Sequence, residues 1–372
     1  MVAYAPYGTI SKFLPALNAV DLRTSARCLR RLPGFRLLKG NEVCFGVMYT
    51  MESMNADIKS CLNRICATRM SDDLSYLCDH PLKYRKANYV RPGGGANSLD
   101  EADTYICQQL EAVAYRVMKT KHRVKAFRSD KSKPLHHWHS APEPSDTEYT
   151  VQNLEATKTG RTQSDEIIQL VSHKDSQSWI DSPGAHDNGT GTVVHMEIAR
   201  LLATCDLRRS VRMLFCNEEH TPWTSRFAAE AAAARGDSII AVMNIDSVDG
   251  KSEEDVAAGR MTHVVAHSTD EGQRLAEFAA DCAGKYCGNL ELRIAEKQPV
   301  NDDDGMFIKA GFPCTIMHVG SWPYADAEYH LPGDVPQRVN MENIELSTRF
   351  ILATILELDG QPFSNRRPAY RR

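Results

Sequence analysis

From about residue 150 onward, short apolar runs alternate with longer stretches in which apolar residues recur at every third or fourth position. The short runs predict strands. They lie at 166–172, 210–216, 238–246, 262–268 and 314–320. The longer stretches, such as "TGTVVHMEIARLLATC" and the final "NMENIELSTRFILATILELD", predict helices. This alternation predicts an α/β fold: a three-layer sandwich with a central mixed, mostly parallel sheet and helices on both faces.

Before residue 150 the pattern is weaker. Residues 1–70 carry Arg and Cys residues without a clear period, so they are treated as an N-terminal extension of uncertain fold, and 71–372 as one large domain. Within that domain, Ser98 and Glu101 form an S-x-x-E capping box that predicts the start of a helix. The polar, proline-broken stretch 129–149 predicts a loop.

Composition narrows the possible partners. With a net charge of −4 and a pI near 6.4, the 372-residue chain has no electrostatic reason to bind nucleic acid or an anionic membrane. No apolar run reaches the roughly 18 residues that span a bilayer, so no transmembrane segment is expected, and the first residues lack the pattern of a signal peptide. The 11 cysteines are odd in number and include no C-x-x-C pair, which favours reduced thiols. We expect a cytoplasmic protein, or a secreted one if a signal was missed at the start.

Candidate chemistry occurs where the predicted strands end. In open α/β sheets, ligands bind beyond the carboxyl ends of the strands. The residues at these places are His173 and Asp175 after the first run, Glu218 and Glu219 after the second, Asp246 after the third, and His330 beyond the last. Imidazole and carboxylate groups are ligands of divalent cations such as zinc.

A further candidate, Asp187, lies among three glycines in "DSPGAHDNGTGT", just before a predicted helix. Neither G-x-x-x-x-G-K-[ST] nor G-x-G-x-x-G is present, and a central carboxylate repels phosphate but suits a cation. Taken singly, each acid is more often a solvated turn residue or helix cap, and a lone His is more often packed or exposed than a ligand. The joint pattern of two His and several carboxylates favours one site for divalent cations.

Five motifs, in order, carry a resemblance to a known family. They are His173-x-Asp175-Ser176, "GAHDNGTGTVVHMEIARLL", Glu218-Glu219, "NIDSVDG" and Tyr329-His330-x-Pro-x-Asp334. Together they are similar to metallopeptidase family 28, the di-zinc aminopeptidases and their carboxypeptidase relatives. The similarity spans residues from about 80 to 360 and implies the fold of that family, a zinc-aminopeptidase or phosphorylase/hydrolase-like sandwich. Residues 1–70 lie outside it.

The resemblance implies a pair of zinc ions, with cobalt or manganese acceptable to the same donors. By position in the motifs, His173 and Asp246 would bind one ion. Glu219 and His330 would bind the other, and Asp187 would bridge both.

The remaining roles also follow from the resemblance. Asp175 would orient His173 through its other ring nitrogen. Glu218 would be the general base, which takes a proton from water between two metals about 3.5–4 Å apart and passes it to the leaving amine. Adjacent acids can divide these roles because consecutive side chains at a strand end point in different directions. Tyr329 would stabilise the tetrahedral oxyanion, or else be a packed aromatic beside the ligand.

The chain departs from the family pattern in three places. After the paired acids it has "HTPWTSRF" where a glycine-rich stretch is common, so His220 and Trp223 are expected to reshape the pocket wall. In "NDDDGMF", 301–307, the three acids either raise cation affinity or bind a substrate's α-amino group, or they form a solvated helix start. The stretch "HHWH", 136–139, lies in the predicted loop, where an adventitious or surface role is expected.

The resemblance therefore implies a metal-dependent exopeptidase, most simply an aminopeptidase acting on peptides with a free N-terminus. One alternative is a glutaminyl cyclase, which shares the fold but uses one zinc. Another is an inactive receptor-like or scaffold relative. The complete ligand set favours the peptidase, whereas side-chain preference and oligomeric state are left open.

Overall fold

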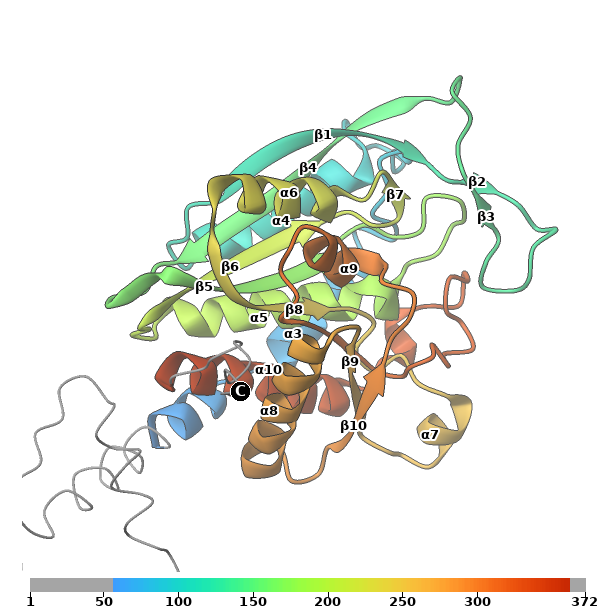
Figure 1. Ribbon diagram of the computed structural model, residues 1–372. Helices are drawn as coiled ribbons and strands as arrows, with labels where there is room; N and C mark the ends of the chain where they lie inside the picture. Colours follow the sequence, from blue (N-terminus) through green and yellow to red (C-terminus); the bar gives the residue numbers. More distant parts are fainter. Residues whose placement is uncertain (1–55, 362–372) are drawn as a thin grey trace, which may run out of the picture. The chain divides into compact units, whose positions relative to one another are not determined.

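The computed structural model describes residues 56–361, and a nine-stranded mixed sheet runs through them (Figure 1). The strand order is β10-β9-β11-β8-β5-β6-β4-β1-β7. The strands are β1 (Met118–Ala126), β4 (Glu148–Lys158), β5 (Gln163–His173), β6 (Arg209–Cys216), β7 (His220–Thr221), β8 (Ser238–Ile245), β9 (Thr262–His267), β10 (Glu291–Glu296) and β11 (Thr315–Val319). A separate small sheet pairs β2 (Arg128–Ser129) with β3 (His139–Ser140).

Four neighbouring strands in the middle of the sheet, β11, β8, β5 and β6, run parallel. Leu170 and Val171, which point to opposite faces of β5, are both fully buried. A strand buried on both faces has continuous apolar sequence, which is why these strands were readable as unbroken apolar runs. Because parallel strands end at the same edge, the residues that follow β5, β6, β8 and β11 meet there.

Helices cover both faces of the sheet, so the predicted fold class is confirmed (Figure 1). They are α3 (Ala67–Cys78), α4 (Ser98–Glu111), α5 (Gly191–Ala203), α6 (Thr224–Arg235), α7 (Glu253–Ala257), α8 (Asp270–Tyr286), α9 (Asp302–Lys309) and α10 (Met341–Gly360), with the short turns η3 (Ala185–Thr190) and η4 (Pro336–Arg338). On one face α6 and α9 pack over the strands. On the other, α5 lies against β5 and is surrounded by α3, α4 and α10.

The core under α6 and α9 shows why these helices sit where they do. Ile167 and Val171 of β5 pack against Phe307 of α9 and against Ala229 and Ala232 of α6. The small alanines let α6 approach the sheet closely, while each fully buried large apolar side chain contributes about 1.5–3 kcal/mol. This packing fixes the start of α9 beside the ends of the parallel strands.

The structure corrects two local expectations and adds one strand that the sequence analysis did not predict. The cap of α4 is Asn97, whose side chain accepts the backbone N–H of Asp100 (2.9 Å), whereas the hydroxyl of Ser98 accepts the N–H of Lys86. The stretch 129–149 is not wholly a loop, since it contains β3 and the start of β4. Strand β1 was not anticipated because it is polar and largely exposed, and so lacks the apolar signal of a strand.

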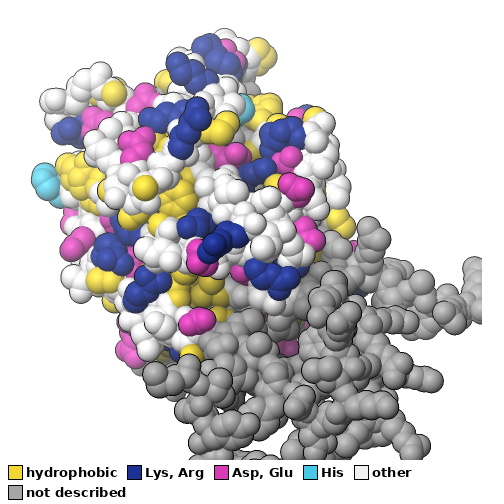
Figure 2. Space-filling model, turned by 90° about the vertical axis from the view of Figure 1, so that its left-hand side faces the viewer, with side chains coloured by type: hydrophobic (Ala, Val, Ile, Leu, Met, Phe, Trp, Pro, Cys, Tyr) yellow, Lys and Arg dark blue, Asp and Glu magenta, His cyan; other side chains and the backbone are white. Residues whose placement is uncertain are grey.

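Helix α3 packs against α5 and α10, so the described body includes residues on both sides of the boundary expected at residue 70. Residues 1–55 of the predicted extension lie outside the described residues. Within 56–361, no helix combines the length and the apolarity needed to cross a membrane. On the face shown in Figure 2, basic and acidic side chains are interspersed.

Candidate metal centre

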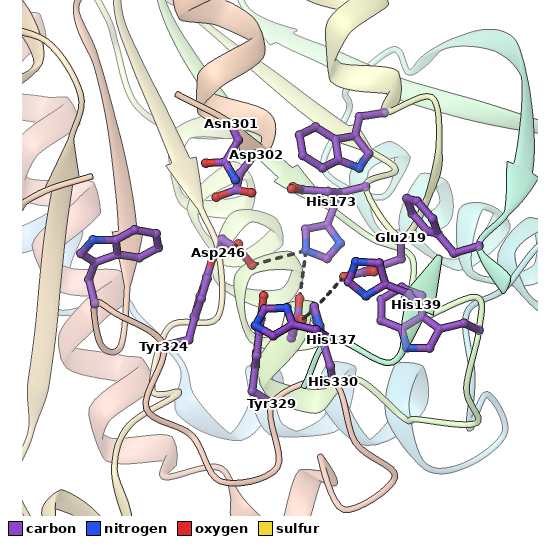
Figure 3. A pocket seen from close by; sticks show the side chains of 16 residues that line it. His137, His139, His173, Glu219, Asp246, Asn301, Asp302, Tyr324, Tyr329 and His330 are labelled. Carbon is purple, nitrogen blue, oxygen red and sulfur yellow. Dashed lines mark hydrogen bonds and ion pairs between the residues drawn. The ribbon is translucent and has the colours of Figure 1, made fainter. Parts of the chain in front are cut away.

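A cavity of about 310 Å³ lies at the edge where the parallel strands end (Figure 3). All but one of the eight site residues proposed from the sequence line it. These seven are His173, Asp187, Glu218, Glu219, Asp246, Tyr329 and His330. The eighth, Asp175, is fully buried behind them.

One group of metal-type ligands joins three segments. His173 is the last residue of β5, Asp246 follows β8, and Asp187 belongs to the turn η3 before α5. The Nε2 atom of His173 lies 3.1 Å from Asp187 Oδ1 and 3.3 Å from Asp246 Oδ1 (Figure 3). All three side chains are buried, and their donor atoms lie within 4.8 Å of one another.

A second group shares one member with the first. His330 Nε2 lies 3.0 Å from Asp187 Oδ2 and 3.6 Å from Glu219 Oε1. Asp187 therefore turns one oxygen toward each imidazole. The two groups therefore share Asp187, and the structure brings together the five residues that the resemblance implied as ligands.

The turn that carries Asp187 is held by the side chain of Asp334 and by close packing against β8. The carboxylate of Asp334 accepts the backbone N–H of His186 (2.7 Å) and of Asp187 (3.1 Å). Gly191, the first residue of α5, lies very close to the end of β8. A Cβ atom at this position would lie 2.3 Å from the carbonyl oxygen of Ile245. Only glycine fits at this position. The glycine therefore allows the turn to pack closely on the sheet, and it needs no explanation as part of a phosphate-binding loop.

The carboxylates of the centre require positive charge. Burial alone would raise the pKa of Asp187, but its hydrogen bonds to His173 and His330 hold that pKa well below its usual range. Burial alone would likewise lower the pKa of His330, but Asp187 and Glu219 raise it to about 10. At His173, burial would also lower the pKa, but the carboxylates of Asp175, Asp187 and Asp246 raise it well above its ordinary value. Imidazolium groups or divalent cations can supply this charge, and cation binding then displaces protons.

The paired acids have different surroundings. Glu219 belongs to the second ligand group, and burial together with Asp187 raises its pKa to about 7. Glu218 belongs to neither group, and its buried Oε2 has no hydrogen-bond partner among the described residues. Burial, followed by the charges of Asp303 and Asp302, raises the pKa of Glu218 well above its ordinary value.

Asp175 lies at the base of the centre. Its two carboxylate oxygens accept the backbone N–H groups of Glu218 and Glu219, each over 2.9 Å, and Oδ1 is 3.4 Å from His173 Nδ1. It also accepts a hydrogen bond from His220. The expectation that His220 shapes the pocket wall is wrong: the residue is fully buried behind the wall, whereas Trp223 does line the cavity.

The three consecutive acids are not a solvated helix start. Asp302 lines the cavity and lies 3.0 Å from the Nζ atom of the fully buried Lys297. Asp303 is fully buried and accepts a hydrogen bond from the thiol of Cys216, while Asp304 is buried against Lys297 (2.7 Å). Of the three, only Asp302 is placed to meet a substrate.

The "HHWH" stretch is partly exposed, and two of its side chains reach the cavity. His137 and His139 line the cavity, and His139 packs against Trp179 with ring centroids 4.6 Å apart. The backbone of this loop reaches the ligand set, because His330 Nδ1 donates to the carbonyl oxygen of His136 over 2.8 Å. The stretch is therefore not purely a surface feature, although His137 is exposed, and nothing local in the sequence shows that this loop reaches the site.

Two tyrosines stack beside His330 (Figure 3). The ring of Tyr329 lies flat on His330, with centroids 3.8 Å apart, and Tyr324 stacks on Tyr329 at 4.4 Å. The hydroxyl of Tyr324 donates to Asp246 Oδ2 over 3.1 Å. Tyr324 was missed from the sequence, where its only signal is its place in the aromatic stretch "SWPYADAEYH".

A third histidine–carboxylate group lies beside the centre. His186 Nδ1 is 3.1 Å from both Asp326 and Asp334, and Nε2 is 3.6 Å from Asp249. Burial would lower the pKa of His186, but these carboxylates raise it well above its ordinary value. The cations paired with this group are Lys251 (2.9 Å) and Arg338 (3.2 Å). Arg338 also pairs with Glu253 (2.9 Å), so the group is part of a larger ion-pair network that supports the turn.

Comparison with known proteins agrees with this geometry. The family model described as Peptidase family M28 matches residues 153–355, more than half of the chain. A probable aminopeptidase of Saccharomyces cerevisiae is 26% identical over 54% of this chain and 55% of its own length. Leucine aminopeptidase 1 of Leptosphaeria maculans is 22% identical over 82% of this chain and 74% of its own. The chain thus spans little more than half of the first relative and about three quarters of the second.

Solved structures share the fold. The zinc aminopeptidase BSAP from Bacillus subtilis superposes with a TM-score of 0.60 at 14% identity, over 79% of this chain and 95% of that one. A glutaminyl cyclase from Bacteroides thetaiotaomicron gives 0.60 at 15% identity, over 78% and 98%. At such identities the likeness shows the fold alone, and one fold serves both kinds of enzyme.

Proposed function

This chain belongs to peptidase family M28, and from that premise we propose that it is a zinc-dependent aminopeptidase. One observation carries the proposal. Asp187 gives one oxygen to each of two histidine–carboxylate groups, and Glu218, a buried carboxyl outside both groups, lies at the same cavity. Relatives named as aminopeptidases support the assignment of the reaction.

The residues of the centre fit two zinc ions. Each group supplies one imidazole nitrogen and carboxylate oxygens within 4.8 Å, which are donors that zinc accepts. In the proposal, His173 and Asp246 hold one ion, Glu219 and His330 hold the other, and Asp187 holds both. Cobalt or manganese suits the same donors. Bound zinc supplies Lewis-acid polarisation of the scissile carbonyl and lowers the pKa of water.

Glu218 is the proposed general base. It belongs to neither ligand group, and its buried Oε2 has no competing partner among the described residues. It takes a proton from the attacking water and returns it to the leaving amine, so one side chain serves both halves of the reaction.

Tyr329 is the proposed partner of the developing oxyanion. Its ring is fixed between His330 and Tyr324, and it lines the cavity. Burial and then the charge of Asp187 raise the pKa of Tyr329 well above its ordinary value, so the phenol keeps its proton and remains a donor. A donor aimed at charge that forms only in the transition state lowers the barrier without tightening substrate binding.

The cavity has two chemically different sides (Figure 3). The carboxylates of Asp302 and Asp246 lie on one side, and the ring of His139, against which Trp179 packs, lies on the other (Figure 3). A positively charged α-amino group is favoured beside the carboxylates. This arrangement supports a peptide substrate with a free N-terminus, held with its amino group toward Asp302.

Metal analysis beside a panel of aminoacyl anilides tests the proposal. We expect two zinc ions per chain and hydrolysis that a chelator abolishes and added zinc restores. One zinc per chain, with formation of pyroglutamate from N-terminal glutamine and no peptide hydrolysis, would replace the peptidase by a glutaminyl cyclase. A protein that neither binds zinc nor hydrolyses any substrate would be the inactive relative.

A further inference from the structure

His220 connects the metal centre to a segment more than 130 positions away in the chain. Its ring is fully buried; Nδ1–H donates to Asp175 Oδ2 over 2.8 Å, and Nε2 accepts the backbone N–H of Ala87 over 3.2 Å. One nitrogen faces a carboxylate and the other faces a backbone donor. The neutral ring with its proton on Nδ1 therefore satisfies both bonds at once.

Asp175 holds the residues on which the proposed chemistry depends. Oδ1 accepts the N–H of Glu218 and Oδ2 accepts the N–H of Glu219, each over 2.9 Å, while Oδ1 lies 3.4 Å from His173 Nδ1. A carboxylate can serve two consecutive N–H groups only while its plane faces both. Rotation about the Cβ–Cγ bond of Asp175 would therefore disturb both N–H contacts and the 3.4 Å contact with His173, whose Nδ1 also lies 3.2 Å from the backbone carbonyl oxygen of Asp175.

We propose that His220 is a positioning residue of the metal centre: its hydrogen bond fixes the plane of the Asp175 carboxylate, which in turn aims Glu218, Glu219 and His173. The inference rests on the proposed zinc aminopeptidase function. It accounts for an imidazole directly after the paired acids, where a glycine-rich stretch is common in the family. The backbone donor at Ala87 adds to it, because it holds the far side of the ring and leaves Nδ1–H no other direction to point.

A purely structural His220 would only fill space and satisfy the N–H of Ala87. The two roles use different nitrogens and can be separated. An Asn side chain can place its amide nitrogen at the position of Nδ1, which keeps the donor to Asp175 and leaves the N–H of Ala87 unpaired. A Gln side chain reaches the position of Nε2, where its oxygen can accept from Ala87, but it leaves Asp175 without the donor.

The test compares the full-length wild type with His220→Asn and His220→Gln. Steady-state kcat and KM, zinc affinity by competition with a chromophoric chelator, and Tm are measured for each. We expect His220→Gln to lower kcat about 10- to 100-fold with little change in KM, and to weaken zinc binding by a similar factor. His220→Asn should stay near wild type in both, although its unpaired buried N–H makes it the variant with the lower Tm.

Activity and stability should thus rank the two variants in opposite orders. Equal losses in both variants, or losses that follow Tm, would show a packing role only and overturn the inference. Wild-type behaviour of both variants would also overturn it. If the wild type binds zinc but cleaves no peptide, the proposed activity fails, and the ratio of zinc affinities decides the positioning role alone. If the wild type binds no zinc, both proposals fail.

Discussion

The two sides of the metal centre are built differently. On the strand side, His173 ends β5, Asp246 directly follows β8 and Glu219 lies three residues beyond β6, so the hydrogen-bond ladder of the sheet sets their positions. On the loop side, Tyr329 and His330 lie in the long connection after β11 and are held by another loop. His330 Nδ1 donates to the carbonyl of His136 (2.8 Å), and His136 Nδ1 donates to the carbonyl of Tyr329 (2.6 Å).

The two sides meet different requirements of the proposed reaction. Proton transfer and shared metal binding need side chains fixed to a fraction of an ångström, and buried strands provide such rigidity. A substrate wall must instead present rings of a chosen shape, and loops can vary these without disturbing the core. We therefore expect changes on the strand side to act mainly on kcat, and changes among the rings of the loop side to have smaller effects.

The largest effect should come from Glu218→Gln on the strand side. We expect kcat to fall about 1,000-fold, because the amide cannot take the proton, while zinc content stays unchanged because Glu218 is not a proposed ligand. Kinetics and metal analysis on one preparation check this. The matched control is Asp302→Asn, an acid at the same cavity, which should raise KM much more than it lowers kcat. Unchanged kcat in Glu218→Gln would refute the assigned base.

The second largest effect is expected from a substitution on the loop side, Tyr329→Phe. Tyr329→Phe keeps the ring stacked on His330 but removes the donor to the developing oxyanion, so kcat should fall about 100-fold. KM should change little, because the lost bond forms in the transition state. Measured kcat and KM for a neutral aminoacyl anilide decide the point. A rise in KM alone would show that Tyr329 binds substrate and does not stabilise the oxyanion.

The same division explains how much was predictable. The strand-side residues were found from sequence because each combines a buried apolar run with a ligand-type side chain directly after it. The positions of Glu218 and Asp175 also followed from local motifs. The three departures from the family pattern were read incorrectly or left open, since the meaning of His220, Asp303 and the "HHWH" loop depends on contacts across the fold. His136, for example, bonds to a residue 193 positions away.

Tyr324 belongs to both sides, because it is a loop residue that bonds to a strand-side ligand. Tyr324→Phe keeps the stack on Tyr329 but removes the hydrogen bond to Asp246 Oδ2. We expect about a tenfold loss of zinc affinity or kcat, the usual effect of removing a partner of a metal ligand. Chelator competition measures it. An unchanged affinity and kcat would show that the sheet alone positions Asp246.

The smallest expected effect is on the pH dependence of stability, and it comes from histidines in the core and not from the metal centre. His263 and His318 face each other on β9 and β11 (3.1 Å), and burial lowers the pKa of His263 to about 3. Below pH 6.5 the unfolded chain binds a proton at His263 and the folded chain does not, so stability falls as the pH drops toward 3. The free energy of unfolding should lose up to about 1.4 kcal/mol per pH unit from this group.

His263→Gln should flatten that slope by up to the same amount, because it removes the titrating group and keeps a polar partner for His318. Urea unfolding of wild type and variant at pH 7 and pH 5 measures the difference. The imidazoles of the centre behave oppositely in zinc-free protein: the pKa of His330 is raised to about 10, so its stabilisation is complete below pH 6.5 and is lost as the pH rises toward 10. If the variant kept the full acid slope, the pH dependence would have to arise elsewhere in the protein. One fold thus holds neutral imidazoles in its core and charged ones at its centre, and the pH at which stability is lost tells which kind is titrating.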